Sequence, residues 1–156
     1  MRPWMIEASF DYIRGSRLLF DNKRPGPGFV DAAIGLEILL KSFLAKVDGP
    51  EGGIGEQYVF DKQAHGSNGH GHNLLQLFDS IPTDVKEQLG LAEYRSWIED
   101  FFQEPFLRAR YPYEPGATAS YLTVLTEIAE EMLDKVVRAY IKQGCDDPWF
   151  KQYPNC

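Results

Sequence analysis

Apolar side chains recur every three or four positions along most of this chain, which is the spacing of one face of an α-helix. The pattern is clearest in "GFVDAAIGLEILLKSFLAKV", where it predicts a long helix over residues 28–47. The stretches "KRPGPG" before it and "DGPEGG" after it are predicted to break the helix, because Pro and Gly disfavour its continuation. The apolar stripe of this helix holds Phe29, Ala33, Leu36, Leu40, Phe43 and Val47.

The same spacing predicts two further long helices, one toward each end of the chain. The first covers residues 4–22, and its predicted inner face carries Ile6, Phe10, Ile13 and Arg17. The last covers residues 117–142, with a stripe of Leu122, Leu125, Ala129, Met132, Val136 and Tyr140. The charged residues of this last helix fall on its other faces, which predicts that those faces meet solvent.

Shorter helices are predicted between residues 72 and 103. Asn73 is the expected N-cap of "LLQLFDSI", and Thr83 is the expected cap of a second helix that stops at Gly90. In "LAEYRSWIEDFFQ" one side is predicted to be buried, and it carries Leu91, Tyr94, Trp97, Ile98 and Phe101. Residues 49–71 are rich in Gly and polar groups and predict a long loop, with a short helix or turn around "EQYVFDKQ". No strand pattern is expected.

These elements predict an all-α protein built as an up-and-down bundle of four to five helices. A chain of 156 residues fits one domain over residues 1–156, with the bundle at about 4–142 and a short C-terminal tail at 143–156. A domain of this length can bury roughly 70% of the surface of its unfolded chain, so it needs no stapling by disulfides or metals.

Composition limits the classes of function. The net charge of −7 argues against a protein that coats nucleic acid, although a local basic pocket remains compatible with it. The most apolar stretch, "IGLEILLKSFLAKV", is interrupted by Glu37 and Lys41 and is too short and polar to span a membrane. The chain start has no signal-peptide pattern, and Cys145 and Cys156 do not make a disulfide framework, so free thiols and a cytoplasmic location are expected.

All three histidines lie in "HGSNGHGHNLLQLF". Zinc needs three or four converging ligands, and no second ligand cluster accompanies His65, His70 and His72, so they are weak metal candidates and no cofactor is predicted. His65 and His70 are expected to be solvated loop residues. His72 differs because it immediately precedes the cap of an apolar helix, and it is the candidate for a functional imidazole.

Two charged residues outside the histidine segment, Glu37 and Lys41, belong to the same candidate site. Glu37 adjoins the apolar stripe of its helix, so its carboxylate requires a cation or hydrogen-bond donors. His72 and Lys41 are the candidate partners, and Lys41 lies four residues further on the same helix. The alternative is that Glu37 is a purely structural polar residue whose needs are met within the fold.

The segment "RARYPYE" combines cations with aromatic rings. Guanidinium groups beside tyrosine rings can bind an anion or a nucleotide through charge-assisted hydrogen bonds and stacking. The alternative is that Arg110 ties the connecting segment to an acid such as Glu37 or Glu114 while the tyrosines pack. The candidate binding residues in this segment are Arg108, Arg110, Tyr111, Tyr113 and Glu114.

Taken together, three stretches resemble the HEPN domain family. The first is "DAAIGLEILLKSFLAK", with Ala32, Glu37, Leu40 and Lys41 at the family spacing, the second is "GHNLLQLFDSIP", and the third is "FLRARYPYE". The resemblance covers about residues 5–142. It implies a helical bundle that is commonly dimeric, in a family of ribonuclease toxins, partners of small nucleotidyltransferases, and inactive nucleotide- or RNA-binding members.

One departure from the family pattern bears on catalysis. Ribonucleases of the family carry Arg, then four to six residues, then His on a late helix, whereas this chain has no histidine after His72. Neither a Gly-x-Ser-x-Gly nor a Walker motif is present. The resemblance therefore predicts a non-catalytic domain rather than a family-type nuclease.

Three functions are consistent with the sequence. The first is a non-catalytic HEPN-like domain of a toxin–antitoxin or defence system, which forms a homodimer and binds RNA or a nucleotide, or an operon-encoded partner such as a small nucleotidyltransferase. The second is a divergent metal-independent ribonuclease that uses His72 as acid–base group and Arg110 as phosphate ligand. The third is a purely structural protein-interaction subunit. None of them involves a membrane.

Overall fold

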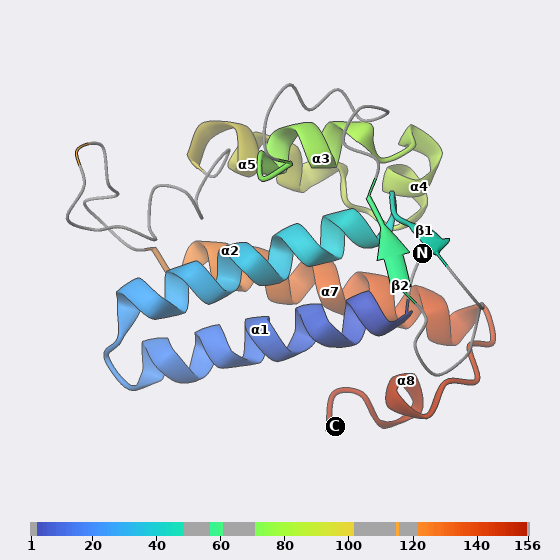
Figure 1. Ribbon diagram of the computed structural model, residues 1–156, viewed down its shortest axis with the longest axis horizontal. Coiled ribbons are helices and arrows are strands. Elements are labelled where there is room, and N and C mark those ends of the chain that lie inside the picture. The colour runs from blue at the N-terminus through green and yellow to red at the C-terminus, as the bar shows by residue number, and fades with distance from the viewer. Residues whose placement is uncertain (1–2, 49–56, 61–70, 102–114, 116–121, 156) are drawn as a thin grey trace.

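A computed structural model describes residues 3–48, 57–60, 71–101, 115 and 122–155 of the chain. The predicted all-α class is confirmed. Three long helices lie side by side, and a layer of short helices covers α2 and α7 (Figure 1). The long helices are α1 (Pro3–Asp21), α2 (Pro25–Ser42) and α7 (Val124–Lys142); the short ones are α3 (Leu74–Ser80), α4 (Thr83–Gln88), the 3-10 helix η1 (Ala92–Tyr94) and α5 (Arg95–Phe101).

The pair α1 and α2 forms an antiparallel hairpin, and α7 crosses behind it in the same direction as α2 (Figure 1). The two helices of the pair approach closely at Gly35, where an added Cβ would lie 2.7 Å from Ile13 Cγ1. Ser9 in α1 donates a hydrogen bond of 2.8 Å from Oγ to the Gly35 carbonyl. A glycine is therefore required at this helix contact, because any side chain would force the backbones apart.

The break between α1 and α2 is shorter than the sequence pattern predicts. Helix α2 begins at Pro25, so "PGPG" forms its first turn, and only residues 22–24 separate it from α1. A proline in the first turn is tolerated because its missing N–H would have no helical acceptor there. At the other end α2 stops at Ser42 and not at residue 47, and the chain turns into a strand.

That strand corrects the expectation of no β-structure. β1 (Lys46–Asp48) pairs antiparallel with β2 (Gln57–Val59), in a register that places Val47 opposite Tyr58. The predicted helix or turn around "EQYVFDKQ" is therefore wrong, since its described part is strand β2. Three-residue strands are too short to show a clear alternation in the sequence.

Within the second layer, the predicted cap of α3 is confirmed, because the Asn73 side chain accepts a hydrogen bond of 2.9 Å from the Gln76 amide. The predicted cap of α4 is wrong: Pro82 occupies that position and Thr83 is the first helical residue. Gly90 does end α4, with a φ of 64°. Trp97 was expected on the buried side of α5 and is instead 45% exposed.

The periodic stripes of the long helices are buried as predicted. Ile6, Phe10 and Ile13 of α1 lie in the core, and so do the corresponding residues of α7, Leu125, Ala129, Met132 and Val136. Leu122, the first residue of the predicted α7 stripe, precedes the helix and is 46% exposed. Arg17, predicted on the inner face of α1, extends to α7 and forms a bidentate ion pair with Glu130.

The C-terminal segment, expected as a short tail, contains the helix α8 (Pro148–Gln152). Phe150 is 1% exposed and stacks on Tyr140 of α7 with ring centroids 4.9 Å apart. Trp149 contacts the Phe10 ring of α1 edge-on at 5.4 Å. The segment is thus packed onto the long helices, and its aromatic residues extend the core. Among the described helices, none has the length and apolarity needed to cross a membrane.

Candidate functional site

The candidate site is a polar cluster between α2 and α3 that is centred on Glu37. This residue is only 9% exposed and lies in the C-terminal third of α2. Lys41 donates a hydrogen bond of 2.6 Å from Nζ to Glu37 Oε1. His72 Nδ1 lies 3.0 and 2.9 Å from the two carboxylate oxygens. The largely buried carboxylate therefore has two cationic or donor groups, which offset the cost of removing it from water.

Local sequence explains why these groups meet. Lys41 lies four residues after Glu37, in the orientation that favours a Glu–Lys pair on a helix. His72 directly precedes the Asn73 cap, so the start of α3 fixes its position. The buried face of α3 anchors that start against the core through Leu74, Leu77 and Phe78.

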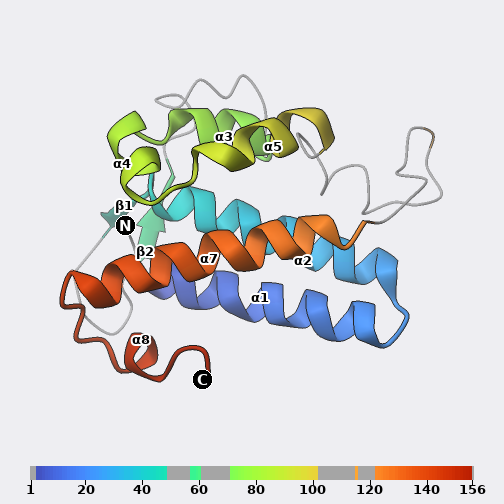
Figure 2. The same ribbon diagram turned by 180° about the vertical axis from the view of Figure 1, so that it is seen from behind.

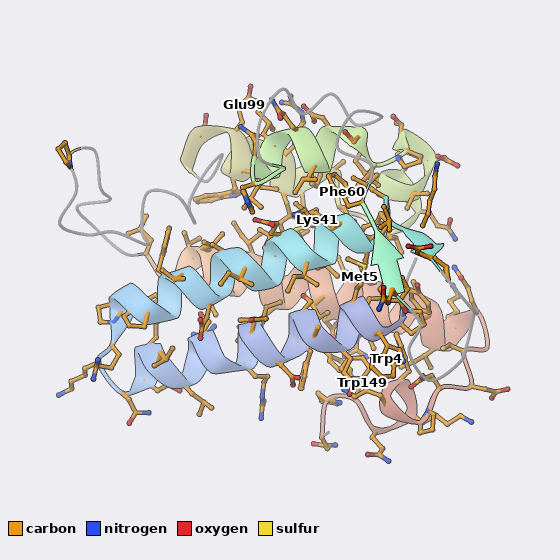
Figure 3. The ribbon with its side chains drawn as sticks, viewed as in Figure 1. Trp4, Met5, Lys41, Phe60, Glu99 and Trp149 are labelled. Atoms are coloured by element: carbon orange, nitrogen blue, oxygen red, sulfur yellow. The ribbon has the colours of Figure 1, made fainter. Side chains whose placement is uncertain are left out.

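An aromatic ring completes the cluster, and sequence reasoning missed it. Phe60 follows β2, and its ring centroid lies 5.3 Å from Lys41 Nζ (Figure 3). This distance is in the range of a cation–π contact. Nothing in the sequence itself singles out this residue, because Tyr58, Val59 and Phe60 are all apolar, and their alternation between half-buried and exposed positions is visible only in the structure.

The geometry determines how the imidazole is oriented. Because a carboxylate only accepts hydrogen bonds, the contact with Glu37 requires a proton on Nδ1 of His72. In the neutral ring the lone pair is then on Nε2. The side chain of His72 is 32% exposed, and that of Lys41 is 17% exposed. We define the Glu37 cluster as Glu37, Lys41, Phe60 and His72.

Of the residues predicted for a site, the structure brings Glu37, Lys41 and His72 together. The remaining predicted residues lie outside the described part of the chain, so their placement stays a prediction. They are His65, His70, Arg108, Arg110, Tyr111, Tyr113 and Glu114. In the part that is described, no group of three or more His, Cys, Asp or Glu side chains could hold a metal ion.

Near the cluster on α2, one further carboxyl is perturbed. Burial raises the pKa of Asp31 above its ordinary value, because removal from water disfavours the charged form. Asp31 lies six residues before Glu37, and its Oδ2 would lie 3.2 Å from a Cβ added at Gly15 of α1. It therefore belongs to the α1–α2 contact and not to the Glu37 cluster.

Comparison with known proteins gives no relative that would assign the site: the chain matches no protein-family model, no curated protein sequence and no solved structure.

Proposed function

We propose that this chain is a non-catalytic helical binding domain of the HEPN kind, and that the Glu37 cluster binds a nucleotide or an RNA nucleotide unit. The observation that carries the proposal is the convergence of an ammonium group, an imidazole and an aromatic ring around one largely buried carboxylate. The all-α bundle and the positions of Glu37, Lys41 and His72 in it are compatible with the family resemblance.

In this proposal Glu37 is a positioning residue. It restrains Lys41 and His72, whose side chains would otherwise sample many rotamers, and so lowers the entropic cost of binding. Lys41 has three N–H donors, and one is directed to Glu37. The others can donate to a phosphate oxygen, and His72 can add a second donor when it is protonated.

Phe60 favours a nucleotide over a simple anion. Bases stack on aromatic side chains, and each such contact contributes roughly 1–3 kcal/mol. An ammonium group beside such a ring matches a ligand that carries a phosphate next to a base. The segment with Arg108 and Arg110 is proposed to supply further phosphate contacts, as the sequence predicts.

Substitution of Lys41 tests the site. Lys41→Met is expected to weaken binding of a fluorescent adenine nucleotide and of a short labelled single-stranded RNA by about tenfold, because a charge-assisted hydrogen bond to phosphate is lost. Phe60→Leu is expected to weaken the binding of both ligands less than Lys41→Met does. Fluorescence anisotropy at low salt measures the dissociation constants.

The matched control is Lys86→Met. Lys86 also lies 5.3 Å from an aromatic ring, that of Phe78, and its removal changes the net charge equally. This variant should bind as the unmodified chain does. Equal weakening in both variants would mean that net charge alone governs binding, and the proposed site would be wrong.

A second candidate is a ribonuclease, favoured by the carboxylate–imidazole pair. A glutamate that accepts a hydrogen bond from Nδ1 orients an imidazole so that its Nε2 can exchange protons with a substrate hydroxyl. The same RNA samples distinguish the two functions. Cleavage that is lost in His72→Gln would favour the nuclease, and intact RNA at saturating protein favours the binding domain.

A further inference from the structure

On the face of the molecule opposite to the one seen in Figure 1, α7 lies in front (Figure 2). Side chains of α7 between residues 124 and 135 line a groove there. One part of it is a pocket of about 540 Å³ between α1, η1 and the segment after α8. Its floor is apolar: Ile13 and Leu133 are each 2% exposed, and Phe10 is 6% exposed. A pocket of this volume is within the range that binds ligands.

The pocket continues toward the start of α7. A second hollow of about 250 Å³ shares Glu93, Tyr94 and Glu131 with the first and reaches Trp97 and Val124. Trp97 is 45% exposed, although a side chain of this size is usually more buried. We call the two hollows together the α7 groove. Along α7, from residue 124 to 135, it is roughly 16 Å long at 1.5 Å per residue.

Negative charge predominates at the rim of the α7 groove. The cations that line it are Arg14 and Lys135, and Arg14 lies against the Phe10 ring at 5.6 Å. The carboxylates that line it outnumber them and are Glu93, Glu127, Glu130, Glu131 and Asp134.

Two of these carboxylates differ from the others in their partners. Glu93, Glu130 and Asp134 form ion pairs with Lys135, Arg17 and Arg138. Within the described residues, by contrast, no ion pair joins a cation to Glu127 or Glu131. Glu127 acts on the Arg17 guanidinium only at longer range, adding to the rise of its pKa that Glu130 causes, and Glu131 accepts a hydrogen bond of 2.9 Å from the neutral Tyr94 hydroxyl. They lie four positions apart on α7, a spacing at which like charges repel. The middle of the groove therefore favours an incoming cation.

We infer that the α7 groove docks a basic, amphipathic segment of a partner protein. Lysine or arginine side chains of that segment would lie against Glu127 and Glu131. One aliphatic or aromatic side chain would cover Phe10 in the first hollow, and another would contact Trp97 in the second. The apolar floor and the exposed tryptophan favour a peptide over a small polyamine, which has no bulky apolar group. A polyanion such as RNA is disfavoured by the rim carboxylates. The groove is thus a site distinct from the Glu37 cluster.

The test uses the full chain and a labelled helical peptide of about twelve residues, built of lysine and leucine, which is about 18 Å long. Glu127→Gln with Glu131→Gln is expected to weaken its binding about fivefold, since two partly exposed charge contacts are lost. Trp97→Ala is expected to weaken it about threefold. Thermal melts of each variant establish that it is folded.

Two matched controls make the result specific. Asp48→Asn with Asp84→Asn removes the same charge from β1 and α4, and Trp4→Ala removes an exposed tryptophan, 63% accessible, from α1. Both should bind the peptide as the unmodified chain does. Equal weakening by the control and groove variants would overturn the inference. So would spermine binding that depends on Glu127 and Glu131 while the peptide does not bind.

Discussion

Replacing Phe150 with alanine is expected to lower the free energy of unfolding by about 3 kcal/mol, the usual cost of removing a buried phenylalanine. Its ring is 1% exposed, stacks on Tyr140 and contacts Trp149 edge-on at 5.0 Å. The loss arises because α8 covers part of the core formed by α1 and α7. Urea denaturation followed by circular dichroism measures the change.

Leu18→Ala is the control for this prediction, because Leu18 is 62% exposed on α1. Its substitution should change stability by less than about 0.5 kcal/mol. If Phe150→Ala changed stability no more than Leu18→Ala does, the C-terminal segment would be a tail that does not stabilise the fold, as the sequence pattern alone suggested.

The second large effect is expected at Glu37. Glu37→Leu should destabilise the fold by about 3 kcal/mol, because it leaves Lys41 and His72 facing an apolar side chain in a mostly buried place. Glu37→Leu combined with Lys41→Met should cost clearly less than the sum of the two single substitutions, since an apolar pair has no unpaired charge. A double-mutant cycle in urea gives the coupling energy.

The exposed pair Asp134–Arg138 is the matched control, as it has the same spacing on a helix. Its coupling energy should be below about 0.5 kcal/mol. A similarly small coupling energy for Glu37 and Lys41 would show that the Glu37 cluster is solvated, and the positioning role assigned to Glu37 would then be untenable.

The sequence predicted the long helices well because their burial is periodic. Residues such as Leu36, Met132 and Val136 are buried on one face of their helix, and this burial produces a periodic pattern in the local sequence. Contacts between distant segments produce no such pattern. Ser16 and Thr126 share a hydrogen bond of 2.7 Å between buried hydroxyl groups, and nothing in either local pattern predicts their pairing.

The elements that the sequence did not predict are short, and contacts with distant parts of the chain stabilise them. Strands β1 and β2 are stabilised by pairing with each other, and α8 by aromatic contacts with α1 and α7, so neither needs a long amphipathic pattern. The Glu37 cluster was partly predictable, since Lys41 lies one turn away and His72 precedes a cap. Phe60 was not, because its place depends on the β1–β2 pairing.

Nucleotide binding by the Glu37 cluster is tested most directly by NMR of the His72 imidazole during titration with ATP. Spectra of His72→Gln assign the ring signals. We predict that these signals shift saturably with ATP, and that the shift disappears in Lys41→Met but persists in Lys86→Met. Unchanged His72 signals at an ATP concentration that saturates binding elsewhere on the chain would contradict the claim.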